Sequence, residues 1–579
     1  MQNDREETYF QTFNLSAMKK NFLFMSVLAA LLMAGCSKEE SAPNGGDDGN
    51  GEANTSYLSV NLISSDNASR AAENYEDGTP DENKVTSVRF YFFNGSGSAV
   101  DVKLKGNQYV NYYDWEPKSG DQEKDDNDTD YIESVLNATI VINTATGDRI
   151  PQRIAAIMNP STATLGEGSK SLDALKEIYR DYANPYLTKS GKFVMFNAVY
   201  AENGTHFSSA PIVAENLCKD AEAAKKNPVT IKVERNVAKV KVTLDSSIGF
   251  TDGKLALKDK DGNPILVKNE QVYLKLNGWD LTAEAEKTRL VKKINPAWGG
   301  GNWWNGIDRT FWAINAPNAG NSDYDYNAIK NPFLDNDKPY ALYTNENAED
   351  CSSSDKINRT KVIISGTLCD PEGNPFTIAR HMGAYYADSY DKDNETNNLT
   401  VLKTSILGQL SANGHHYYYA DGTARKPITV SDLKISTDLQ ETENSKNNCY
   451  VYAQLTNDAA NNKTWYNTDA QDAQPIAPTV INDALKKKEI VDRALVWSEG
   501  KTYYFYEIKH TIGGNSQSGV VRNHIYDTHV TKIAGLGTPV YDPKEVIYPE
   551  VPDPNNHYIA AEIKILSWRV VSNDYELEW

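Results

Sequence analysis

The sequence has no excess of positive charge and few residues suited to catalysis or metal binding. Its 579 residues include 59 Lys and Arg against 79 Asp and Glu, a formal charge of −20, with only 8 His and 5 Cys. Nucleic-acid binding needs a basic surface that displaces counterions, so this balance disfavours a nucleic-acid partner. The chain also contains no His-Glu-x-x-His, phosphate-loop or dinucleotide motif, and its cysteine spacing fits no zinc site. We therefore expect no enzyme activity, no cofactor and no bound metal.

Long apolar runs are scarce as well. The exception, at residues 22–34, spans 13 residues and is too short to cross a bilayer. It follows two lysines and leads through small residues to Cys36, so we assign residues 18–35 to a signal peptide and residues 1–17 to a non-native extension. The residues around Cys36 resemble the lipobox of bacterial lipoproteins. That resemblance implies that the Cys36 thiol takes a diacylglyceryl group and that the precursor carries palmitate-type chains.

The other four cysteines leave alternatives open. Cys351 and Cys369 would form a disulfide in an oxidising compartment. Buried free thiols are an equally good interpretation of these two positions, and also of Cys218 and Cys449.

Alternating apolar residues and turn signals recur almost to the end of the chain. Leu58, Val60 and Leu62 share one phase, which predicts a strand at 57–63. Similar short strands are predicted in both halves of the chain, with Asn-, Asp- and Gly-rich loops between them. Since there is no strand–helix–strand rhythm, the pattern favours β-sandwiches with a few short helices over a parallel sheet. We place a domain boundary near residue 245, where a strongly alternating stretch ends.

The last segment, residues 538–579, begins with a proline-rich linker and ends in dense alternation. From residue 558 onward, the phase of the alternation changes at 565–566 and again at 570–571. These changes predict two or three strand pieces separated by bends or bulges. A terminal apolar strand on a linker can pair with its own sheet or with a neighbour's. The apolar residues of this segment include Ile559, Ala561, Ile563, Ile565, Leu566, Trp568 and Val570.

Several motifs follow one another in a distinctive order. They are the lipobox at Cys36, the strand at 57–63, Arg70, VERNVAKV at 233–240, VRNHIY at 521–526, and Ile563 with Leu566, Ser567 and Trp568. In this order they resemble the fimbrillins of Bacteroidota type V pili, and most closely the minor-fimbrillin branch of shaft subunits. The resemblance runs from residue 18 to the last residue. It implies a mostly β protein with two tandem Greek-key (transthyretin-like) β-sandwich domains, at 71–245 and 246–537.

The same resemblance implies how the chain is processed. The precursor travels to the outer membrane as a lipoprotein on Cys36. An arginine-specific or trypsin-like protease then cuts between Arg70 and Ala71 and removes residues 36–70, which include the strand at 57–63. The loss of that strand opens a groove, and the C-terminal donor strand of a neighbouring subunit fills it.

The implied partners are other copies of the chain, accessory, anchor and tip subunits of the fimbria, and host or bacterial surface ligands. The implied location is a cell-surface fimbrium that supports adhesion or biofilm formation. Two alternatives stay open: a tip or anchor subunit, and a surface lipoprotein that binds glycans. Trp298, Trp303 and Trp304 lie in a glycine-rich stretch and would stack on sugar rings in the second case, although packing of that loop onto a sandwich is the simpler explanation.

Overall fold

The computed structural model describes residues 54–573, apart from several gaps of five residues or fewer and the longer gaps 66–77, 125–131, 182–192, 294–323, 334–339, 348–358, 390–398 and 548–557. Strands dominate the described residues, and the longest described helix is α5 (Thr400–Ala412). The prediction of a mostly β chain with a few short helices is confirmed. None of the described helices is long and apolar enough to cross a membrane.

A ten-stranded sheet encloses the first hydrophobic core. Its main path runs β5 (Tyr112–Trp115), β2 (Val88–Phe93), β8 (Arg153–Met158), β10 (Met195–Asn197), β15 (Val229–Arg235), β1 (Asn54–Ser65), β7 (Ile132–Thr144) and β6 (Gln122–Lys124). Two short strands, β13 (Ala210–Pro211) and β14 (Leu217–Cys218), pair with β8 and β1. Apolar side chains of β2 and β8 share one core with those of β1 and β7. The two halves of the sheet therefore face each other across this core, as in a sandwich.

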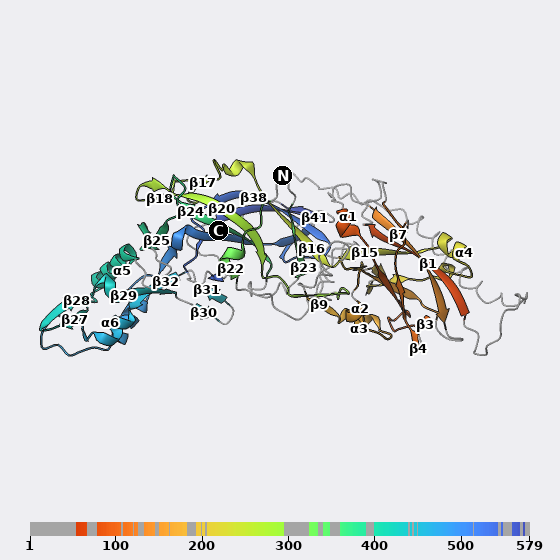
Figure 1. Cartoon of the computed structure of the whole chain (residues 1–579), viewed down its shortest axis with the longest axis horizontal. Helices are drawn as coiled ribbons and strands as arrows, with labels where there is room; N and C mark the ends of the chain where they lie inside the picture. The colour runs from red at the N-terminus through yellow and green to blue at the C-terminus, as the bar shows by residue number, and fades with distance from the viewer. Residues whose placement is uncertain are drawn as a thin grey trace, which may run out of the picture. The chain divides into compact units, whose positions relative to one another are not determined.

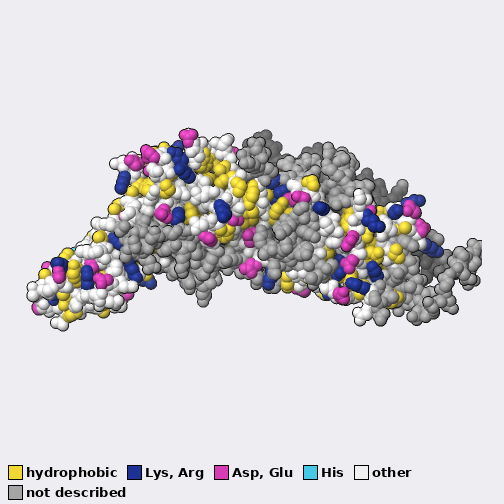
Figure 2. Space-filling view, viewed as in Figure 1, with side chains coloured by type: hydrophobic (Ala, Val, Ile, Leu, Met, Phe, Trp, Pro, Cys, Tyr) yellow, Lys and Arg dark blue, Asp and Glu magenta, His cyan; other side chains and the backbone are white. Residues whose placement is uncertain are grey.

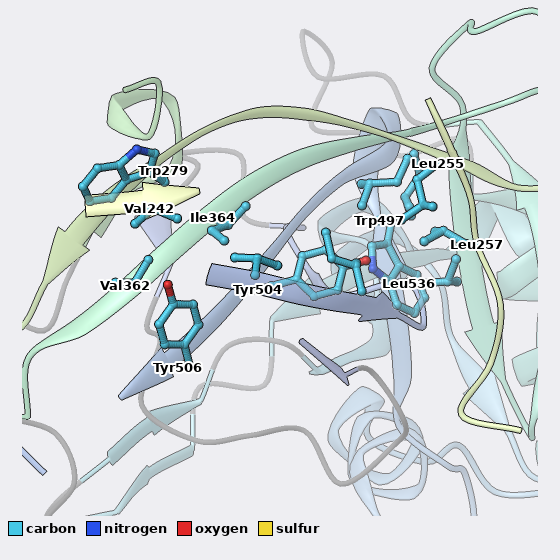
Figure 3. Close-up of a cluster of buried hydrophobic side chains, with 14 of the residues drawn as sticks. Val242, Leu255, Leu257, Trp279, Val362, Ile364, Trp497, Tyr504, Tyr506 and Leu536 are labelled. Atoms are coloured by element: carbon cyan, nitrogen blue, oxygen red, sulfur yellow. The ribbon is translucent and has the colours of Figure 1, made fainter. Parts of the chain in front are cut away.

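Two five-stranded sheets pack on the second core. One runs β23 (Leu342–Asn345), β16 (Val237–Leu244), β38 (His524–Ala534), β41 (Tyr558–Ser567) and β42 (Val571–Asn573). The other runs β17 (Leu255–Ala256), β20 (Tyr273–Thr282), β24 (Lys361–Cys369), β35 (Lys501–Glu507) and β39 (Thr538–Pro539). Figure 3 shows Val242, Ile364 and Tyr506 among the side chains of this core. Val242 comes from β16 in one of these two sheets, and Ile364 and Tyr506 come from β24 and β35 in the other.

A third core lies within the segment predicted as a single C-terminal domain. It is built on the sheet β26 (Ala384–Asp388), β25 (Thr377–His381), β34 (Ala494–Trp497), β32 (Tyr450–Leu455) and β29 (Leu433–Thr437). Helices α5 and α7 (Pro478–Lys486) contribute Leu402, Ile406 and Ile481 to it. Apart from Tyr541, the buried residues of this third core all come from the chain between β24 and β35, which strand patterns alone do not reveal.

The chain passes from the first core to the second near a bend at Asn236, between β15 and β16. Val233 on β15 and Val237 belong to the first core, whereas Ala238 and Val240 on β16 belong to the second. The boundary predicted near residue 245 coincides with the end of β16, whereas the change from the first core to the second lies between Val237 and Ala238. Two consecutive strands of different sheets, joined through Asn236, thus form the junction between the two cores.

Candidate functional site

Strand β1 occupies an interior position in the first sheet. On one side it pairs antiparallel with β7, from Asn54 opposite Thr144 to Ser65 opposite Ile132. On the other side it runs parallel to β15 over residues 60–63, and β14 pairs with Tyr57 and Leu58. The strand predicted at 57–63 is confirmed, and both of its edges are hydrogen-bonded.

Both faces of β1 are buried near its centre. Leu58, Val60 and Leu62, the three apolar residues identified in the sequence, are 0, 0 and 2% exposed and point into the first core. Ser59 faces the other way, yet it is also buried, and its hydroxyl donates to the Ala138 carbonyl at 3.3 Å. The centre of β1 therefore combines large apolar side chains on one face with a small polar one on the other. Ser59 gave no signal in the sequence, because burial of the second face depends on what packs there.

Several predicted site residues lie outside the described residues. These are Cys36, Arg70, Ala71, Trp298, Trp303, Trp304, Trp568 and Val570. Cys369 is a buried free thiol, which corresponds to one of the two states left open for it, and Cys218 is free as well. Among the described residues, no cluster of three or more His, Cys, Asp or Glu side chains is placed to hold a metal ion.

The C-terminal segment pairs within its own chain, in the sheet of the second core that contains β16 and β38. Strand β41 pairs antiparallel with β38, from Tyr558 opposite Ala534 to Ser567 opposite His524, and Figure 1 draws both strands in blue beside β16. A predicted break at 565–566 is wrong, because the ladder continues regularly there and the bulge falls in β38 between Val530 and Lys532. The predicted donor residues on β41 are Ile559, Ala561, Ile563, Ile565 and Leu566.

The motifs at 233–240 and 521–526 meet at the junction between the first two cores. The Arg235 backbone N–H donates to Asn523 Oδ1 at 3.0 Å, and β16 runs parallel to β38 from Lys239 opposite Ile525 onward. Figure 2 shows acidic and basic side chains interspersed over the described part of the face in view, whereas this junction holds charges inside the protein. The order of the motifs along the chain does not reveal that they touch.

Two buried ion pairs form the centre of this junction. Lys292 Nζ lies 3.1 Å from Glu234 Oε1, and both side chains are fully buried. Arg522 Nε lies 2.7 Å from Glu346 Oε2, and its guanidinium also donates to the carbonyls of Arg289 and Leu290. Burial raises the pKa of Glu234 despite the opposing effect of Lys292. Since each ion is removed from water, each depends on its partner to remain charged.

A buried histidine lies beside this junction, on β36 (Lys509–Ile512). His510 Nδ1 is 2.9 Å from the Tyr526 hydroxyl. The hydroxyl oxygen accepts a hydrogen bond from the Val521 N–H at 2.7 Å. The ring of His524 packs edge-on against His510, with the ring centroids 4.8 Å apart. Burial, followed by His524 and Lys292, lowers the pKa of His510 well below its usual value. His510 is therefore neutral in the folded chain at pH 7.

This burial predicts that stability falls as the pH drops below about 6.5, the pKa of an unfolded histidine. Below that value the unfolded chain binds a proton that folded His510 does not accept. The free energy of unfolding should therefore fall by about 1.4 kcal/mol for each pH unit because of His510. Urea unfolding at pH 7.5 and 5.5 measures the change. His510→Gln keeps a hydrogen-bond acceptor for Tyr526 and should lose this part of the pH dependence. Equal slopes in both proteins would contradict the prediction.

The comparisons with known proteins match the two regions just described. A family model for the major fimbrial subunit protein (FimA) matches residues 56–235, which contain β1 and β15. A second model, for the C-terminal part of fimbrillin, the major fimbrial subunit protein type IV, matches residues 496–574, which contain β38 and β41. A search of the curated proteins found no match.

Solved structures resemble the chain only weakly. A fimbrillin (FimA) from Porphyromonas gingivalis is 13% identical, with 90% of this chain and 98% of that chain covered and a TM-score of 0.35. The tip fimbrial protein Mfa3 from the same organism is 11% identical, with 89% and 100% covered and a TM-score of 0.31. A cell adhesion protein from Bacteroides eggerthii is 10% identical, with 90% and 98% covered and a TM-score of 0.34. These structures therefore carry no argument. The two family models, over residues 56–235 and 496–574, are what support a fimbrial subunit similar to the fimbrillins.

Proposed function

We propose that this chain is a fimbrial shaft subunit that is exported as a lipoprotein on Cys36, cut between Arg70 and Ala71, and polymerised by strand exchange. The observation that carries the proposal is the position of β1, an interior strand whose side chains complete a core built by the rest of the sheet. Strand β1 continues into the rest of the fold through the segment that holds Arg70, the one Lys or Arg between Lys38 and Lys84. A single cut there separates a core-filling strand from the domain that it completes.

The slot that β1 would leave is costly to keep empty. Burial of Leu58, Val60 and Leu62 contributes about 1.5–3 kcal/mol for each side chain. The facing edges of β7 and β15 would also present unpaired N–H and C=O groups. A matching strand from another molecule restores both contributions. Cleavage and assembly should therefore be coupled, with the incoming strand pairing as β1 leaves.

The slot imposes a pattern on the strand that fills it. Since Ser59 is buried between Leu58 and Val60, the incoming strand needs a small residue at that position and apolar residues on either side. Within residues 558–579, LSWRV at 566–570 and IAAEI at 559–563 have this pattern. The first repeats the Leu-Ser pair of β1 and begins where the pairing of β41 with β38 ends. We therefore propose 566–570 as the donor segment, with the slot widening around Trp568.

Limited proteolysis of the precursor from residue 37 onward tests this proposal. Trypsin at a limiting dose should give a dominant new N-terminus at Ala71, followed by a ladder of oligomers on a native gel. Arg70→Gln should stay intact and monomeric at the same dose. Chains that lack residues 558–579 or 568–579 should be cut but remain monomeric. The shorter truncation retains β41 beside β38, so its failure to assemble would not reflect loss of that strand.

Each outcome separates one part of the proposal. A precursor that resists trypsin at Arg70, or a cut chain that stays a stable monomer, would overturn the shaft-subunit assignment. Assembly of the chain without 568–579, but not of the chain without 558–579, would instead identify 559–563 as the donor segment. Assembly of both truncated chains would show that the C-terminal segment is not the donor.

A further inference from the structure

The chain that follows the predicted cleavage site forms a single helical turn. Helix α1 (Pro80–Asn83) begins with a capping box, in which the Thr79 hydroxyl accepts from the Glu82 N–H at 3.3 Å and Glu82 Oε2 accepts from the Thr79 N–H at 2.7 Å. A helix of four residues is far too short to be stable alone. Other parts of the protein must therefore hold it in place.

The Glu82 side chain reaches the sheet of the second core. It is 1% exposed, and its Oε1 lies 3.0 Å from Lys239 Nζ on β16 and accepts from the Tyr343 hydroxyl on β23. Burial by itself would raise the pKa of Glu82, but Lys239, Tyr343 and the Thr79 N–H outweigh it, so the pKa is lowered. The residue therefore stays ionised and links the first core's chain to two strands of the second core.

Arg235 holds the same turn from the other side. Its fully buried guanidinium donates from Nε to the Glu82 carbonyl at 3.4 Å and from Nη2 to Asn83 Oδ1. Its backbone N–H donates to Asn523, as described above. A Cβ at Gly78 would meet this guanidinium and the Asn83 amide, so a larger residue there would require both side chains to shift. The turn at 78–84 is thus held by β15, β16, β23 and the segment that leads into β38.

We propose that Glu82 and Asn83 anchor the new N-terminal arm of the cut chain at the junction between the first two cores. The inference rests on the proposed cut after Arg70. Once β1 leaves, the arm would otherwise be a free end next to β2, and free ends fray unless they are tied down. Because β2 is an interior strand of the first sheet, fraying would spread into the domain that must accept the incoming strand. The anchor confines the loss to β1.

Hydrogen exchange before and after cleavage tests the anchor. A site for a sequence-specific protease placed within 66–77 makes the cut independent of Arg70. After this cut, the amides of α1 and β2 should stay protected in the wild type and in Lys84→Gln, a control that removes an exposed charge at the end of the same helix. Glu82→Gln loses the charged partner of Lys239 and should exchange about 10- to 100-fold faster at α1, the range expected for loss of a hydrogen bond to a charged group.

Asn83→Ala is a second test variant in case Glu82→Gln does not fold. It leaves Glu82 in place and removes the half-buried amide that contacts Arg235 and donates to the Gly78 carbonyl at 3.1 Å. It should also speed exchange at α1 in the cut chain, and more than in the uncut one. Wild-type exchange rates in both cut variants would overturn the anchor. That result is distinct from failure of the proposed function, which would appear as an intact Arg70 in the trypsin experiment.

Discussion

Replacing Lys292 with methionine should destabilise the chain by about 3–5 kcal/mol, the cost of removing one partner from a buried ion pair. Lys292 and Glu234 are both fully buried, and their charged atoms lie 3.1 Å apart. Methionine fills a similar volume, so the loss would come from the charge that remains on Glu234 rather than from a cavity. Because burial already raises the pKa of Glu234, that carboxylate can take up a proton at acid pH. The penalty should therefore be smaller at pH 5 than at pH 7.5.

The matched control replaces both partners. Glu234→Leu combined with Lys292→Met leaves no buried charge at this position, and such replacements are often neutral or stabilising. Urea unfolding of the two variants beside the wild type measures the difference. A double variant as unstable as the single one would show that the pair itself, rather than the orphaned charge, stabilises the junction.

Leu58→Ala should destabilise the precursor by about 2–5 kcal/mol and leave the assembled fibre unaffected. The first effect follows from the complete burial of Leu58, since truncation leaves a cavity in the core. The second follows from the proposed removal of β1, because the mature subunit then no longer contains residue 58. Thermal unfolding of the precursor and of purified fibres measures both effects.

Ile140→Ala is the matched control for this test. Ile140 lies directly opposite Leu58 on β7, is equally buried and belongs to the same core. It stays in the mature chain, so its truncation should weaken the precursor and the fibre alike. If Leu58→Ala weakens the fibre as much as Ile140→Ala does, then β1 is retained in the fibre and the proposed exchange is wrong.

Some features of the site were predictable because their signals are local. The alternation of Leu58, Val60 and Leu62 predicts a strand with one apolar face, and β1 is that strand. Other features were not. Helix α5 escaped notice although it belongs to a separate core, and the change of phase at 565–566 predicted a break where β41 runs straight through. A phase change in a strand signals a bend only when one face is solvated, and that depends on what covers each face.

The sequence by itself determined the class of the chain: a mostly β protein with alternating strands near both ends and motifs in the order of the fimbrillins. Period-two alternation and motif order are properties of neighbouring residues, so they can be read without a fold. Only the tertiary structure decided that β1 lies between β7 and β15, that Ser59 is buried, and that Glu82, Glu234 and Arg522 find charged partners inside the protein. The partners of β1 and of these charges are remote in sequence, and Arg522 lies 176 residues from Glu346. Only folding brings them together, because burial and charge pairing depend on distance in space.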